Sequence, residues 1–159
     1  MGFLRRWLAL WRDSPRPSHP EAGRPLGRTE PLSRVAFSKS DLRRSAGRLH
    51  WAAFDPGPAG RLSCIQVAGL AEREIWDLTL TVLAHRKDRD TVYGRGDFHA
   101  GIATNAGLRA LRDDDPFERH CELKGWPIGA AGKSERMLLA KRLAETAVLH
   151  MPTSPLRLS

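Results

Sequence analysis

The segment "RLSCIQVAGLAEREIWDLTLTVLAHR", residues 61–86, decides the fold class because a strand pattern passes into a helix pattern. Residues 61–67 form a short, largely apolar run of the kind that predicts a β-strand. In residues 71–86, Ile75, Leu78, Val82 and Leu83 recur at the spacing of one helix face. A strand followed at once by an amphipathic helix predicts a chain of mixed α and β structure.

The segments on either side extend this pattern. Residues 48–54, "RLHWAAF", precede the turn "DPGPAG" and are expected to pair with residues 61–67 as a hairpin. Downstream we expect a short helix over 98–106 that stops at Gly107, strands over 108–112 and 118–124 around "DDDPF", and a long helix over 134–150. The fold class predicted is α+β, with a small antiparallel sheet of about four strands in ββα–αββα order and helices packed on one face.

Composition divides the chain into four parts. Residues 1–12 form an amphipathic N-terminal segment, and residues 13–47 form a basic linker or arm whose first part is rich in proline. Residues 48–151 are expected to be a single globular domain, which suits a chain of 159 residues, and residues 152–159 a tail.

The charge is concentrated near the N-terminus. The formal net charge is +8 and the isoelectric point about 10.5, so acidic partners are favoured. Residues 1–48 hold 11 basic against 4 acidic side chains, whereas residues 49–159 are close to neutral, with 15 against 14. Arg34, Lys39, Arg43, Arg44 and Arg48 form the densest basic cluster, which predicts contact with DNA or RNA phosphates or with another acidic macromolecule.

Residues 3–12 place Phe3, Leu4, Trp7, Leu8 and Trp11 on one helical face. Such a face is expected to dock on the protein's own body or on a protein partner, or to lie on a membrane surface. An unselected extension upstream of the true start is a further interpretation. No apolar run approaches the length of a transmembrane helix, and two cysteines, Cys64 and Cys121, fit no disulfide framework, so we expect a cytoplasmic protein.

The stretch "GWPIGAAGKS", residues 125–134, resembles a phosphate-binding loop but fails its pattern. The position where the first glycine is needed holds Pro127, which has no N–H to offer a phosphate. Only 25 residues follow Ser134, too few for the strands that such a nucleotide-binding fold needs. We therefore expect no nucleotide cofactor, and retain Lys133 and Ser134 as weak anion contacts at a helix start, with Ser134 as the N-cap.

One set of residues could perform acid–base chemistry. Alternation along 118–124 puts His120, Glu122 and Lys124 on one sheet face, and His50 would join them if its strand lay beside theirs. His50, His120 and Glu122 are thus the candidate catalytic residues of a metal-independent phosphodiesterase or RNase-type toxin. The alternative is an ordinary polar, solvent-facing side of a sheet. The cysteines and histidines have no metal-ligand spacing, and no cofactor is expected.

Five short motifs occur in order along residues 60–150: "GLAEREIW", "YGRGD", "GL", "DDDPFERH" and "GWP". Their order resembles that of a small uncharacterised bacterial α+β protein family. The resemblance implies one compact bacterial domain and no activity. Taken together, we expect a non-enzymatic binding or accessory protein that contacts nucleic acid through its Arg-rich arm.

Overall fold

The computed structural model describes residues 23–159, so the amphipathic segment at 1–12 and the linker up to residue 22 lie outside the described part. Within it, one six-stranded antiparallel sheet has the order β7-β8-β4-β1-β6-β9. Its strands are β1 (Pro31–Ala36), β4 (Leu62–Gln66), β6 (Gly94–His99), β7 (Arg109–Arg112), β8 (His120–Lys124) and β9 (Val148–His150). The helices are α2 (Glu72–Ala84), α3 (Ala100–Asn105) and α4 (Lys133–Thr146).

Two small ribbons and three 3₁₀ turns complete the described chain. β2 (Leu42–Arg43) pairs with β3 (Arg48–Leu49), and β5 (Thr91–Val92) pairs with β10 (Leu156–Arg157). The 3₁₀ turns are η1 (Lys39–Asp41), η2 (Arg44–Ala46) and η3 (Trp51–Phe54).

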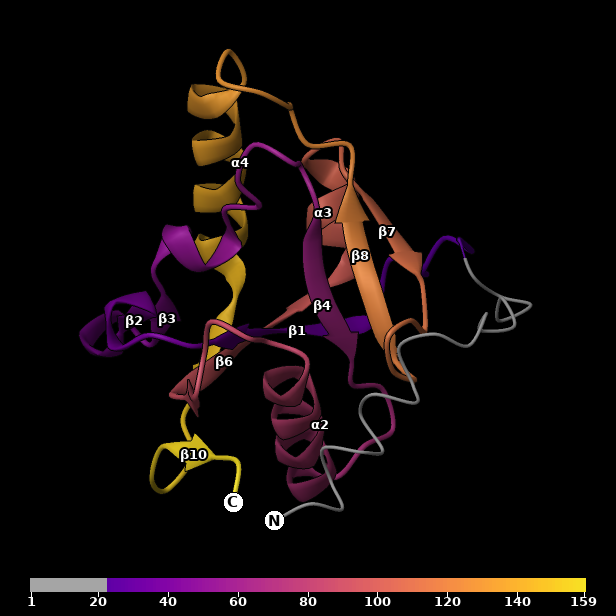
Figure 1. Ribbon diagram of the computed structural model, residues 1–159. Helices are drawn as coiled ribbons and strands as arrows, with labels where there is room; N and C mark the ends of the chain where they lie inside the picture. Colours follow the sequence, from indigo (N-terminus) through magenta and orange to yellow (C-terminus); the bar gives the residue numbers. More distant parts are fainter. Residues whose placement is uncertain (1–22) are drawn as a thin grey trace.

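The sheet bends sharply in its middle. Figure 1 shows β4, β8 and β7 upright, with β1 and β6 running across them. All of β1 pairs with β6, but only Leu32 with Gln66 and Ser33 with Ile65 pair between β1 and β4. β1 and β4 therefore part beyond Ser33, and each continues along its own outer neighbour.

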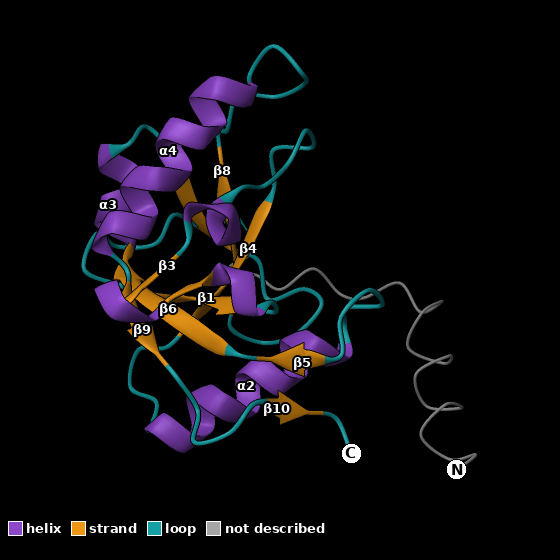
Figure 2. Ribbon diagram, turned by 90° about the vertical axis from the view of Figure 1, so that its left-hand side faces the viewer, coloured by secondary structure: helices purple, strands orange, loops and turns teal. Residues whose placement is uncertain are grey.

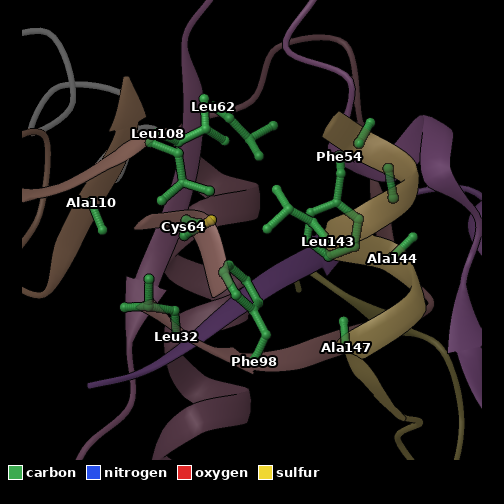
Figure 3. Packing of buried hydrophobic residues seen from close by; sticks show 14 of the residues in the cluster. Leu32, Phe54, Leu62, Cys64, Phe98, Leu108, Ala110, Leu143, Ala144 and Ala147 are labelled. Atoms are coloured by element: carbon green, nitrogen blue, oxygen red, sulfur yellow. The ribbon is translucent and has the colours of Figure 1, made fainter. Parts of the chain in front are cut away.

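One face of the sheet carries the main core. Its apolar side chains pack against η3, α3 and α4, as Figure 3 shows for Leu32, Phe54, Phe98 and Leu143. Phe54 and Phe98 meet edge to face at 5.6 Å between ring centroids, a favourable aromatic geometry. Small residues of α4, including Ala140 and Ala144, are buried and let this helix lie close to η3.

The opposite face is covered by α2, which Figure 2 shows on the other side of the sheet from α3 and α4. Two smaller apolar clusters connect α2 to the sheet, one around Leu83 with Val35 and one around Ile75 with Ile65. The helix begins at Glu72, and the Glu74 carboxylate accepts a hydrogen bond from the Ala71 N–H at 2.7 Å, which satisfies an otherwise unpaired donor.

The sequence-based description was confirmed in its coarse features. The chain is mixed α/β with an antiparallel sheet, and three helices lie close to the segments expected to hold them. The strands predicted over 108–112 and 118–124 form the β7–β8 hairpin. Gly107 follows α3 with a φ of 85°, a left-handed conformation that favours glycine.

Several details differ. The sheet has six strands rather than four, and helices cover both of its faces rather than one. Residues 48–54 do not pair with 61–67, because His50 caps a 3₁₀ turn and β4 pairs instead with β1 and β8. The predicted last helix stops at Thr146, and residues 148–150 form β9 at the sheet edge.

The folded unit also begins earlier than residue 48. Residues 31–36, placed in the linker by composition, form β1 between β4 and β6. Leu32 and Ala36 are fully buried there. A truncation at residue 48 would therefore remove a central strand, and the arm and body are not separable at that point.

A buried arginine joins α2 to the sheet. Arg95 of β6 is 1% exposed, and its Nη1 and Nη2 donate to the Glu72 carboxylate at 3.0 and 2.9 Å. Its Nε donates to Asp97 at 3.1 Å, and its Cζ lies 4.4 Å from the centroid of the Trp76 ring. Burial alone lowers the pKa of Arg95, but the hydrogen bonds to Glu72 and Asp97 outweigh it and raise that pKa overall.

Replacing Arg95 by Met should lower the free energy of unfolding by about 2–4 kcal/mol, because Asp97 then loses its buried partner while the apolar stem is kept. Glu72→Gln, a partner that is 61% exposed, should cost less than about 1 kcal/mol. Urea denaturation of both variants measures the difference. Equal losses of unfolding free energy in the Arg95 and Glu72 variants would show that Arg95 is not the dominant member of the network.

Candidate nucleic-acid interface

The β2–β3 ribbon and the η2 turn between its strands hold three arginines at the surface, Arg43, Arg44 and Arg48. Leu42 and Leu49 face each other across it and pack on the core, while Arg43 and Arg48 form the next pair and are exposed. Backbone hydrogen bonds fix the ribbon from both sides, from His50 N–H to Asp41 O at 2.6 Å and from Leu149 N–H to the carbonyl between the strands at 2.9 Å. Alternation thus turns the leucines inward and the arginines outward.

The ribbon closes against β6 because β6 has no side chain at residue 96. A Cβ on Gly96 would lie 2.7 Å from Leu49 Cδ1, so only glycine lets Leu49 seat at this depth. Gly47, with a φ of 61°, ends η2 and turns the chain back into β3. These two glycines set how far the arginines stand from the sheet.

Beside the ribbon lies an open groove of about 320 Å³, here called the basic groove. Its walls come from the ribbon, from the start of η3 and from α4. They include Arg43, Arg48, His50, Trp51, Lys141 and Glu145. The rings of His50 and Trp51 lie 5.2 Å apart at an interplanar angle of 42°, which gives the groove an aromatic wall.

The electrostatics of the basic groove favour an anion. Arg43, Arg44, Arg48 and Lys141 are exposed, and none forms an ion pair within residues 23–159. Glu145 is the sole acidic side chain among the described lining residues. An array of unneutralised cations beside aromatic rings is the arrangement used to bind phosphates and bases.

His50 contributes to this wall as a neutral ring. Its Nδ1 accepts a hydrogen bond from the Ala52 N–H at 3.3 Å as it caps η3. Partial burial and the nearby Arg43 lower the pKa of His50, while Asp41 raises it less. The imidazole is therefore neutral at pH 7. Its ring can stack on a base, but it adds no positive charge to the groove.

The remaining predicted phosphate contacts lie elsewhere. Arg34 points into the gap between β1 and β4, where its Nε donates to Ala53 O and its Nη1 to Ser63 O, both at 2.7 Å. Lys39 stands 5.9 Å from the centroid of the Tyr93 ring, beside a shallow basin that also holds Asp88 and Asp90. The cluster expected from sequence is thus divided among three places.

Lys133 and Ser134 are exposed in the first turn of α4, but Gly132 rather than Ser134 is its N-cap, with no side-chain cap. The loop before it is filled by the buried Arg136, whose Nη1 donates to Pro127 O at 3.0 Å and Gly129 O at 2.6 Å. A phosphate-binding loop directs N–H groups inward. Here carbonyl oxygens point inward at a cation, so the loop interior has the opposite polarity.

The candidate catalytic residues are not brought together. His50 lies beside the main core, whereas His120 is on the α2 face, in edge-to-face contact with Phe117 at 5.3 Å between ring centroids. His120 and Glu122 do share that face, as alternation predicted, but Glu122 is held by Arg61 at 2.7 Å and Lys124 at 3.3 Å. The condition for His50 to join them, a strand beside that of His120, is not met, because His50 caps the 3₁₀ turn over residues 51–54 on the other side of the sheet.

Sequence reasoning missed Lys141 and the position of Trp51. Trp51 comes three residues after Arg48, the last member of the basic cluster, and this proximity is a signal that could have been used. Lys141 is separated from it by about 90 residues of chain and reaches the groove only because α4 packs on η3. No local sequence pattern predicts that Lys141 reaches the groove.

Neither a metal-binding cluster nor a membrane-spanning helix occurs among the described residues. No three His, Cys, Asp or Glu side chains in residues 23–159 are placed to share a metal ion. None of the helices in that range has the length and hydropathy to cross a bilayer. Comparison with family models finds no match, and no curated protein or solved structure is significantly similar to the chain.

Acid should destabilise the fold through His120. Burial lowers the pKa of His120 and outweighs Asp113 and Glu122, which raise it. The folded state then resists protonation, while the unfolded chain takes up a proton near pH 6.5. The stability contributed by the neutral ring is full above pH 6.5 and is lost as the pH falls from there towards the folded-state pKa.

His120→Gln should therefore flatten the dependence of unfolding free energy on pH below 6.5, and His99→Gln, at an exposed position, should leave it steep. Urea denaturation at a series of pH values measures both slopes. A slope that is unchanged in His120→Gln would contradict the assignment.

Proposed function

We propose that the protein binds single-stranded nucleic acid through the basic groove. The observation that carries this proposal is the set of three exposed cations, Arg43, Arg48 and Lys141, that line the groove beside an aromatic wall and lack ion pairs within the described chain. Arg44, also exposed and without an ion pair there, follows Arg43 in the chain. Charge supplies attraction to phosphates, and the ring of Trp51 supplies a surface for a base.

A single strand suits the groove better than a duplex. The groove is open and short, and its aromatic side chains lie in its wall rather than on a protruding helix. Stacking on an aromatic ring requires an unpaired base, which duplex DNA does not present. Cations that contact only phosphates give little sequence preference, so we expect binding that depends on salt more than on sequence.

The triple variant Arg43→Gln, Arg44→Gln, Arg48→Gln should lower the slope of log affinity against log salt by about 2, because each lost phosphate contact on a single strand removes roughly 0.7. Fluorescence anisotropy of the full chain with labelled oligothymidine and oligouridine, between about 50 and 200 mM salt, measures the slope. The matched control removes the same charge from exposed positions elsewhere, with Arg73→Gln, Lys87→Gln and Arg109→Gln.

An equal fall in slope for both triple variants would mean that net charge alone attracts the polymer, and the groove proposal would fail. Tighter binding of polyglutamate than of either oligonucleotide would instead identify an acidic protein as the partner. Cleavage of the oligonucleotides during the titration would revive the phosphodiesterase hypothesis for His120 and Glu122.

Trp51→Leu tests the stacking part separately. Leucine keeps the apolar contact of Trp51 with the core, so the fold should persist. Loss of one stacked base should weaken binding by about 1–3 kcal/mol, with the salt slope unchanged, since no charge is removed. The anisotropy titrations described above measure both quantities, and a changed slope with unchanged affinity would contradict a stacking role.

A further inference from the structure

A second hollow, separate from the basic groove, lies on the α2 face where β1 and β4 part. It has a volume of about 150 Å³ and is here called the Arg34 cavity. The end of α2 covers it on one side and residues 116–117 and 120 on the other. The cavity exists because the two strands stop pairing after Ser33 and Ile65, which leaves an opening that side chains fill only partly.

Most of the cavity wall is apolar. Val35, Ile65, Val82, Pro116 and Phe117 supply side chains from two strands, a helix and a loop. A cavity of about 150 Å³ with apolar lining is large enough for a benzene ring. The ligand class is therefore a fragment-sized molecule with an apolar body.

The charged part of the wall is cationic. Arg34 and Arg86 both line the cavity beside the imidazole rings of His85 and His120, and no aspartate or glutamate does. Arg86 is neutralised by Asp88, whose Oδ1 lies 3.1 Å from its Nε. Among the described residues, Arg34 has backbone carbonyls as its only hydrogen-bond partners and no carboxylate.

The charge of Arg34 is thus held at a half-buried position, where no carboxylate among the described residues is bonded to it. Burial lowers the pKa of Arg34 and the nearby Arg86 lowers it further, while Asp41, which is not bonded to it, raises it less. The adjacent Cys64 does not compensate, because burial raises the pKa of its thiol to about 12 and keeps it neutral. A half-buried cation that has lost part of its hydration and has no bonded carboxylate is a favourable partner for a bound anion.

We propose that the Arg34 cavity binds a small carboxylic acid, with the carboxylate against Arg34 and an aromatic or short aliphatic body among Val35, Ile65 and Phe117. A planar carboxylate matches the donor geometry of a guanidinium. A phosphate fits less well, because a dianion would lose its hydration against apolar walls. This inference does not depend on nucleic-acid binding at the groove.

Benzoate is the probe, and calorimetric titration of the full chain is the measurement. We expect a dissociation constant of about 1 mM or tighter, as befits a ligand of this size. Benzamide has the same shape without the charge and should bind at least tenfold more weakly, because it cannot neutralise Arg34. Inorganic phosphate should also bind more weakly, since it cannot fill the apolar part.

Two variants locate the site. Val82→Phe should fill the cavity from α2 and weaken benzoate binding at least tenfold while every charge stays in place. Arg34→Gln removes the charge but keeps an amide that can donate to Ser63 O or Ala53 O, and it should weaken binding at least as much. Thermal unfolding confirms that each variant is folded before titration.

The Arg43→Gln, Arg44→Gln, Arg48→Gln variant is the matched control and should bind benzoate as the unaltered chain does. No heat with benzoate, or equal binding of benzamide, would overturn the proposal. Tighter binding of phosphate would overturn the carboxylate assignment. Loss of benzoate binding in the groove variant would place the ligand in the groove rather than at Arg34.

Discussion

The structure depends on β1, the strand that joins the two halves of a bent sheet. On one side it pairs along its whole length with β6, and on the other it meets β4 at only two positions. Where the backbone pairing stops, the Arg34 side chain continues it by donating to Ser63 O on β4 and Ala53 O on η3. A side chain thus supplies the hydrogen bonds that the diverging strands cannot make.

β1 has two buried faces because helices cover both faces of the sheet. Leu32 and Ala36 lie in the main core and Val35 lies under α2, so the layers on both sides rest on one strand. The parting of β1 from β4 leaves the Arg34 cavity, because side chains spaced for paired strands do not fill the widening gap.

Arginine serves opposite purposes in different parts of the chain. Arg95 and Arg136 are buried and bind carboxylates or carbonyls, which fixes α2 on the sheet and the loop before α4. Arg43, Arg44 and Arg48 stand in solvent without partners in the described chain. With 21 arginines in the sequence, counting charge identifies a basic protein, but only packing separates structural arginines from those available to a ligand.

Elements with strong local signals were predictable. The apolar stripe of α2, the turn at Gly107 and the alternation along β8 each depend on residues close together in the chain, and the structure has them where expected. β1 and β6 were missed for physical reasons. β1 follows a proline-rich stretch and carries Arg34 and Ser33, while β6 reads "GRGDFH", with two glycines and two charged residues in place of apolar alternation.

The candidate sites divide in the same way. Local sequence marked Arg43, Arg44 and Arg48 as one basic cluster, and the short β2–β3 ribbon keeps them together. Other features depend on which segments pack together across the sheet. They are the separation of His50 from His120 and the position of Lys141 beside Trp51 in the groove.

The sequence by itself determined the composition class, the basic N-terminal region, three helices and one hairpin, because periodicity and turn chemistry act over a few residues. The tertiary structure alone decided the strand order, the second covered face, the reversed polarity of the "GWPIGAAGKS" loop and the place of each arginine. Those features depend on contacts between residues far apart in the chain, where burial and hydrogen-bond satisfaction of the whole fold outweigh local preference.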